Sequence, residues 1–208
     1  MSETKKYELT SETLVLSGHT LHRIKALKDF GPINAGELGG WVEKEENLSQ
    51  YDNAWVFGNA RVYGNAQVYD SGWVFCNARV FDDAQVCGNT RVYGNAKVYD
   101  NAWVCDDTEV FGNARVCGDT EVFGNARVCG NAQVCGNADY IVFKNFWSSG
   151  RYFTWTRSNN MWKVGCFYGT GEELIKKAYA DSEISGREYE RVVRYVEGIL
   201  ADEKKISN

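Results

Sequence analysis

Residues 139–170 gather side chains that can bind a ligand carrying both a ring and a negative charge. Four basic residues stand against a single acid in this segment, interleaved with aromatic residues that include Trp147. Aromatic faces stack on a base, while guanidinium and ammonium groups neutralise a phosphate. The ligand-binding residues predicted from this chemistry are Arg151, Tyr152, Trp155, Arg157, Trp162 and Lys163.

In this predicted site the basic residues pair with phosphates and one of the Trp or Tyr rings stacks on the base. Aromatic residues alternate onto both faces of the strands expected here. A sheet must bury one of its faces against helices. The alternative is therefore that these side chains form only a core and a cap.

Three strands and two helices are expected to position these residues. The predicted strands cover residues 140–147, 151–157 and 161–167. Thr170 stands three residues before Glu173, and Ser185 three residues before Glu188. A hydroxyl residue at this distance before a carboxylate is typical of a capping box, so a helix is predicted to begin at each.

A six-residue repeat precedes this segment and runs from residue 51 to residue 134 without an insertion. Each unit carries a valine with Ala, Thr or Gly two residues before it, as at Ala60 and Val62. Both residues can point inward from a short strand, and Gly-Asn or Asp-containing pairs tolerate the turns of a corner. Three corners make one coil of 18 residues, which predicts a parallel solenoid with between four and five coils.

This pattern resembles the left-handed parallel β-helix of the hexapeptide-repeat family, in which an aliphatic residue is followed four positions later by a small one. The amino-terminal segments 21–30, 36–41 and 46–49 resemble the phage and prophage type of these proteins, often labelled polymer-forming or uncharacterised. The expected fold is mainly β. Residues 1–50 form an N-terminal hairpin and first-coil cap, residues 51–138 the β-helix, and residues 139–208 a small α+β domain.

The family that this chain resembles includes two classes of enzyme. Acyltransferases of this family use a catalytic histidine and an extruded loop, whereas His19 and His22 precede the solenoid here and no loop interrupts it. Carbonic anhydrases on this fold hold zinc with three histidines, and this chain has two. We predict a protein that is not an enzyme, with no catalytic residue, metal or cofactor. Acyl transfer is the less favoured alternative.

The charge and the cysteines restrict the partners and the compartment. A net charge of −5 opposes whole-molecule binding to long nucleic acid or to a membrane, and leaves room for a local basic site. The polar amino terminus and the absence of about 20 consecutive apolar residues predict a cytoplasmic protein.

Residues 18 apart stack, as Cys87 over Cys105 and Cys117 over Cys135. These cysteines are expected to stay free thiols in a reducing compartment.

These observations lead to two interpretations of the function. In the first, the protein binds and sequesters a small anionic, nucleotide-type ligand, for which an immune signal captured by a phage counter-defence protein is the concrete candidate. In the second, the solenoid is a rigid structural or assembly module of a virion or a bacterial scaffold. A homo-oligomer, with a trimer favoured, is expected because outward aromatic ladders can form a subunit interface.

Overall fold

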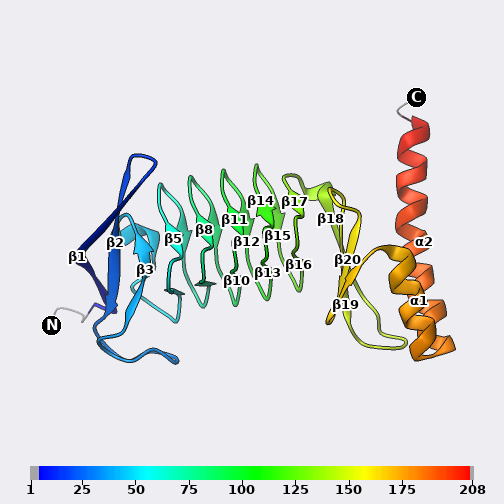
Figure 1. The fold of residues 1–208 in the computed structure, drawn as a ribbon, viewed down its shortest axis with the longest axis horizontal. Helices are drawn as coiled ribbons and strands as arrows, with labels where there is room; N and C mark the ends of the chain where they lie inside the picture. Colours follow the sequence, from blue (N-terminus) through cyan, green and yellow to red (C-terminus); the bar gives the residue numbers. More distant parts are fainter. Residues whose placement is uncertain (1–4, 207–208) are drawn as a thin grey trace. The chain divides into compact units, whose positions relative to one another are not determined.

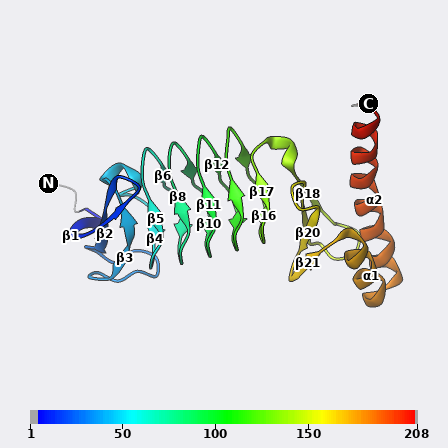
Figure 2. The same cartoon turned by 45° about the horizontal axis from the view of Figure 1, so that its top comes forward.

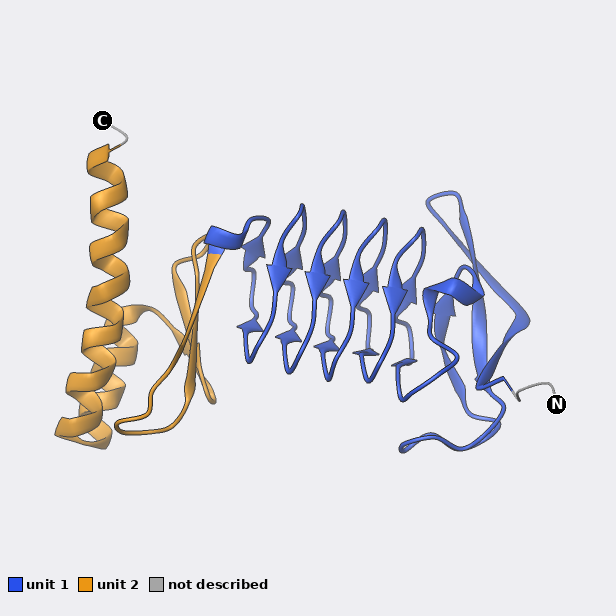
Figure 3. Cartoon of the chain, turned by 180° about the vertical axis from the view of Figure 1, so that it is seen from behind, with its two compact units in different colours: residues 1–139 blue, residues 140–208 orange. Residues whose placement is uncertain are grey.

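The computed structural model describes residues 5–206 (Figure 1). The chain divides into two compact units, residues 1–139 and residues 140–208, and the first unit contains both the predicted N-terminal cap and the repeat (Figure 3). Within the described residues, no helix combines the length and the apolar character needed to cross a membrane.

The six-residue repeat forms fourteen strands of two residues, each ending in a repeat valine. They are β4 (Trp55–Val56), β5 (Arg61–Val62), β6 (Gln67–Val68), β7 (Trp73–Val74), β8 (Arg79–Val80), β9 (Gln85–Val86), β10 (Arg91–Val92), β11 (Lys97–Val98), β12 (Trp103–Val104), β13 (Glu109–Val110), β14 (Arg115–Val116), β15 (Glu121–Val122), β16 (Arg127–Val128) and β17 (Gln133–Val134). Every one of these valines is at most 1% exposed. The predicted inward register is confirmed.

The strands pair in parallel with equivalents 18 residues away and so build three faces (Figure 2). The first face contains β3 (Leu38–Val42), β5, β8, β11, β14 and β17; the second contains β4, β7, β10, β13 and β16; the third contains β6, β9, β12 and β15. Backbone N–H groups donate to the next coil, as from Phe57 to Val74 at 2.8 Å. The structure is a parallel β-solenoid of the hexapeptide-repeat type, as predicted.

Aspartates take part in the corners by two means. Asp100 and Asp106 adopt positive φ angles of 57° and 62°, a conformation that Asp tolerates better than most residues. Their carboxylates also accept hydrogen bonds from the next coil, from the N–H of Gly118 and of Gly124, both at 3.0 Å. The acidic corners therefore hold neighbouring coils together.

A hairpin covers the amino-terminal end of the first face. β1 (Tyr7–Leu16) and β2 (His19–Ala26) pair antiparallel, and β2 pairs antiparallel with β3. Two short 3-10 helices, Glu45–Asn47 and Asn137–Asp139, lie before and after the repeat strands. The predicted N-terminal hairpin is confirmed, and it occupies the edge that β3 would otherwise expose.

The cysteines depart from prediction at one pair. Cys117 and Cys135 form a disulfide across adjacent coils, with their Cα atoms 4.5 Å apart, because the 18-residue register places them directly opposite each other. The expectation of free thiols was wrong for this pair. Cys87 and Cys105, which the same register stacks, are free, and burial together with the neighbouring Cys87 raises the pKa of Cys105 to about 12.

The second unit is a four-stranded antiparallel sheet with two helices. The strands are β18 (Tyr140–Lys144), β19 (Tyr152–Thr156), β20 (Met161–Val164) and β21 (Phe167–Gly169), and the helices are α1 (Gly171–Asp181) and α2 (Glu183–Ile206). The predicted third strand, 161–167, is divided by a turn in which Gly165 has a φ of 53°. That turn creates the fourth strand, which the sequence analysis did not anticipate.

Only one of the two predicted capping boxes forms. Thr170 Oγ1 accepts from the N–H of Glu173, while the N–H of Thr170 donates to the Glu173 carboxylate at 2.8 Å. Hydrogen bonds from the Thr170 N–H and from its hydroxyl to the Glu173 carboxylate lower the pKa of Glu173. The second helix begins at Glu183, earlier than Ser185, because Ser182 ends α1 and its hydroxyl accepts from the N–H of Ser185 at 3.1 Å.

Candidate ligand-binding site

Two of the six predicted ligand-binding residues lie inside the core of the C-terminal unit. Trp155 is 1% exposed and Trp162 is 2% exposed, and both pack with Phe153 against residues of the two helices. The Trp155 indole N–H donates to Asn160 Oδ1 at 2.8 Å. Burial of both rings means that neither has a face free for a ligand.

The other four predicted residues are distributed over different parts of the unit. Arg157 donates two hydrogen bonds to the Glu203 carboxylate, at 2.8 and 3.1 Å, and thereby lowers the pKa of Glu203. Tyr152 and Lys163 stand on strand positions that alternate with the core residues, on the sheet face away from that core. The Arg151 side chain lies against the turn at Gly165. The structure does not bring the six residues together.

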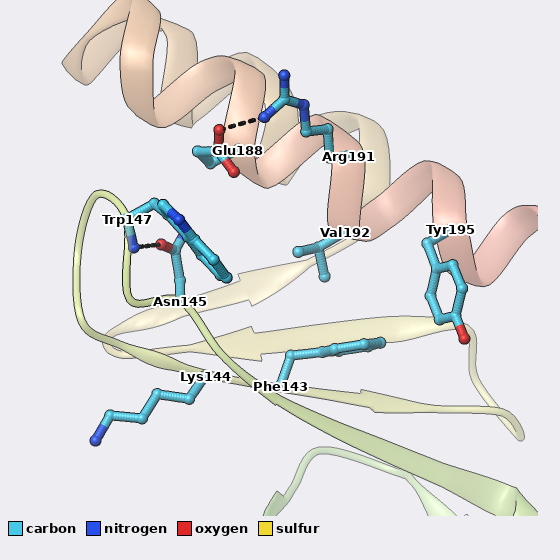
Figure 4. Close-up of a pocket in the computed structure, with 8 residues that line it drawn as sticks. All are labelled: Phe143, Lys144, Asn145, Trp147, Glu188, Arg191, Val192 and Tyr195. Atoms are coloured by element: carbon cyan, nitrogen blue, oxygen red, sulfur yellow. Dashed lines mark hydrogen bonds and ion pairs between the residues drawn. The ribbon is translucent and has the colours of Figure 1, made fainter.

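A groove of about 200 Å³ lies elsewhere in the same unit, between the end of β18 with its following loop and helix α2 (Figure 4). Its apolar lining includes the rings of Phe143 and Tyr195, which meet edge to face with centroids 5.9 Å apart. The residues around it are Phe143, Lys144, Asn145, Trp147, Glu188, Arg191, Val192 and Tyr195.

Asn145 organises the loop side of this groove. Its Oδ1 accepts hydrogen bonds from the backbone N–H groups of Trp147 and Ser148, both at 3.0 Å, which fixes the turn that carries the indole. Asn145 is 4% exposed, and its Nδ2 is buried without a hydrogen-bond partner among the described residues. A buried donor left unpaired costs about 1–3 kcal/mol. The amide therefore keeps one hydrogen-bond donor unsatisfied beside the groove.

The rim of the groove combines one exposed ring with one cation. Trp147 is 76% exposed. The Lys144 side chain points away from the groove (Figure 4), and its ammonium lies 5.0 Å from the centroid of the Tyr152 ring. The Arg191 side chain is 72% exposed and donates to Glu188 at 2.6 Å, a surface ion pair that contributes little. This arrangement can receive a ring inside and an anion at the edge.

Trp147 is one of the interleaved aromatic residues of the sequence, but it was not among the predicted ligand-binding residues. The contribution of α2 was missed because its residues are about 40 positions away in the chain. One signal was present at Asn145. An Asn that ends a strand and precedes a loop is well suited to bond the backbone two and three residues later.

A second cluster with potential chemistry lies in the solenoid unit. His19 Nδ1 lies 2.9 Å from Glu43 Oε1, and the imidazole packs against the Tyr63 ring at 5.0 Å. Burial raises the pKa of Glu43, but hydrogen bonds from His19 and from the N–H of Gly64 outweigh it, so the pKa lies below its usual value. Among the described residues, no three His, Cys, Asp or Glu side chains gather as metal ligands.

Comparison with known proteins finds similarity in the repeats. A family model described as "YdcK Beta solenoid repeat" matches residues 54–74. The chain is 33% identical over 73 residues to a protein of Escherichia coli (strain K12) named "Uncharacterized acetyltransferase YdcK". The match covers 31% of this chain and 22% of that relative, so the chain spans less than a quarter of the relative's length. Together with the parallel coils, these similarities support a repeat β-helix protein.

Proposed function

We propose that this is a binding protein whose C-terminal unit holds a small anionic ligand with an aromatic ring, of the nucleotide type. The observation that carries the proposal is the buried, unpaired Asn145 amide in a groove lined by Phe143 and Trp147. A ligand carbonyl or ring nitrogen would accept from this amide, while the two rings supply apolar contact.

The dimensions of the groove limit what enters it. Its volume of about 200 Å³ is below the roughly 300–1,000 Å³ typical of sites that enclose a whole drug-sized ligand. The groove therefore takes the ring of the ligand, and the charged group stays at the rim. Arg191 supplies the positive charge there, once it turns from Glu188 to the ligand.

Binding of this kind needs no catalytic group. A protein present in excess over a signalling nucleotide silences it by holding it unchanged. The counter-defence role expected from the amino-terminal resemblance is a special case of this proposal. It requires that the protein release the same compound that it captured.

The test is calorimetric titration of the full chain with a panel of linear and cyclic nucleotides, followed by denaturation and mass spectrometry of the released ligand. Trp147→Ala should weaken binding roughly tenfold or more because base stacking is lost. Asn145→Asp should do the same while keeping the loop, since a carboxylate still accepts from the two backbone N–H groups.

The matched control is Trp103→Ala, which removes an exposed indole from the third face of the solenoid. It should leave the affinity unchanged. Unaltered affinity in both groove variants, or no binding by any nucleotide of the panel, would contradict the proposed site.

Acyl transfer is a second candidate, favoured by the name of the bacterial relative and by the His19–Glu43 pair. A carboxylate that holds an imidazole in one orientation supports its action as a general base. Incubation with acetyl-CoA and a panel of amine and hydroxyl acceptors tests this candidate. Activity lost in His19→Ala and kept in His22→Ala would favour the enzyme, whereas no acetylated product would remove it.

A structural role is the remaining alternative, and the oligomer expected from the outward ladders belongs to it. Sedimentation analysis at increasing protein concentration distinguishes an assembly module from a binding protein. Open-ended filaments would favour an assembly module, whereas a discrete trimer would agree with binding.

A further inference from the structure

Four basic residues stand in a single row on the first face of the solenoid. The parallel register places Arg61 opposite Arg79, Arg79 opposite Lys97, and Lys97 opposite Arg115. Trp41 precedes the row and Gln133 follows it. Strands lie about 4.8 Å apart, so the row is about 14 Å long. A protein with a net charge of −5 thus concentrates four positive charges along one line.

No carboxylate forms an ion pair with this row among the described residues. None of the four side chains forms an ion pair, and the Arg61 Nε is buried without a hydrogen-bond partner. The nearby corner carboxylates are engaged elsewhere: Asp82 accepts from the N–H of Asp100, and Asp100 from the N–H of Gly118. Like charges directly opposite each other destabilise a sheet. The row therefore costs stability that the fold does not require.

The other two faces of the solenoid show that the fold does not require a row of like charges. At the equivalent positions the second face alternates Arg91, Glu109 and Arg127, with an ion pair of 2.7 Å between the last two. The third face carries the neutral Gln85 and the acidic Glu121 there. Identical coil geometry thus accommodates a cationic column, one of alternating charge and one that joins neutral residues to an acid, so the cationic column calls for another explanation.

We infer that the first face of the solenoid is a binding strip for a linear polyanion, namely a bare phosphate chain such as inorganic polyphosphate. Guanidinium groups pair with phosphate through two parallel hydrogen bonds. The site lies outside the groove of the C-terminal unit and does not depend on it.

The neighbouring column of aromatic rings disfavours nucleic acid as the occupant. Tyr63, Phe81 and Tyr99 stack on each other at 5.1 and 5.0 Å with interplanar angles of 5° and 3°. Their faces are used within the stack and are not offered to bases, on which sequence-tolerant binding of single strands depends. Recognition then rests on charge alone, which favours the polyanion with the most charge per unit length.

The experiment measures binding of fluorescently labelled polyphosphate to the full chain by anisotropy, competing with a single-stranded oligonucleotide of equal phosphate number and with polyglutamate. Polyphosphate should bind most tightly, and its affinity should fall roughly tenfold or more from about 50 to about 200 mM salt. The double variant Arg79→Gln/Lys97→Gln should lose at least about tenfold in affinity. Glutamine already occupies this column at residue 133, so the variant keeps the fold.

The control Arg91→Gln/Arg127→Gln removes the same charge from the second face and should change the affinity less than about twofold. The charge-preserving Arg79→Lys/Lys97→Arg should bind like the unaltered protein. Removing the repulsion should also raise the Tm of the Arg79→Gln/Lys97→Gln variant, which a merely structural row would lower. Equal losses in both double variants, or tighter binding of the oligonucleotide or polyglutamate than of polyphosphate, would overturn the inference.

Discussion

The solenoid and the C-terminal unit solve the same burial problem in different ways. In the solenoid, every inward valine contacts its equivalent one coil away, and all fourteen are at most 1% exposed. In the C-terminal unit nothing repeats, and one contiguous core joins Phe153, Trp155 and Trp162 to residues of both helices. In the first unit, the orientation of each side chain follows from its place in the repeat. In the second it depends on which face the helices cover.

This difference decides where a functional signal can be recognised. In a repeat, equivalent residues form columns, so a column of unusual composition is easily recognised in the sequence. The corner aspartates, the Cys117–Cys135 pair and the cationic row are examples. In a single small sheet, aromatic residues on both faces look alike in sequence, although one set is core and the other is not. A mutation should therefore have predictable effects in the solenoid and face-dependent effects in the C-terminal unit.

The strongest way to break the solenoid is Val92→Asp. Val92 is fully buried in the middle of the second face, and an unpaired charge there costs several kcal/mol. We expect loss of the β-solenoid, measured as lost cooperative thermal unfolding by circular dichroism. Arg91→Gln, at the adjacent outward position, should change the free energy of unfolding by no more than about 0.5 kcal/mol. A folded Val92→Asp protein would refute the inward register.

Trp155→Ala should disrupt the C-terminal unit alone. Truncating a buried tryptophan costs about 3–5 kcal/mol, and Trp155 also loses its hydrogen bond to Asn160. Hydrogen exchange followed by mass spectrometry should show lost protection in residues 140–208 and retained protection in residues 51–134. If the variant kept its protection and lost only nucleotide binding, Trp155 would return to the ligand site.

The sequence predicted the solenoid well because one register, repeated, specifies strands, corners and the direction of every valine. The amino-terminal hairpin and the Thr170 cap were also predictable, since both depend on local chemistry. The groove was not, because its walls meet only after α2 packs on the sheet. Neither was the burial of Trp155 and Trp162, since alternation along a strand gives two faces without saying which is covered.

The two helix starts of the C-terminal unit offer a smaller test. Thr170→Ala removes both the hydroxyl acceptor and one donor of the capping box, which should destabilise the unit by about 1 kcal/mol. Urea unfolding followed by tryptophan fluorescence measures this change. Ser185→Ala is the matched control, because Ser185 lies inside α2 and its side chain caps no helix start. Equal effects of the two changes would mean that the structure assigns the caps wrongly.

The non-repeating end of the solenoid unit offers a test by pH, at Lys6. Its ammonium is buried and donates to the backbone oxygens of Tyr51 and Ala54 at 3.0 and 2.9 Å. Burial lowers the pKa of Lys6 from 10.5 to about 8. Since the unfolded chain then binds this proton more tightly than the folded one, the free energy of unfolding should rise as pH increases from about 8 toward about 10.

The gain is at most about 3 kcal/mol, and other groups act against it over the same range. Burial raises the pKa values of Cys105 and Tyr7, so their contribution to stability is lost as pH increases. The difference between the unaltered protein and Lys6→Met removes these opposing terms, because both proteins share them. Urea unfolding at pH values on either side of 8 should show this difference moving in favour of the unaltered protein at higher pH. A difference that stays constant would mean that Lys6 is as well solvated in the folded protein as in the unfolded chain.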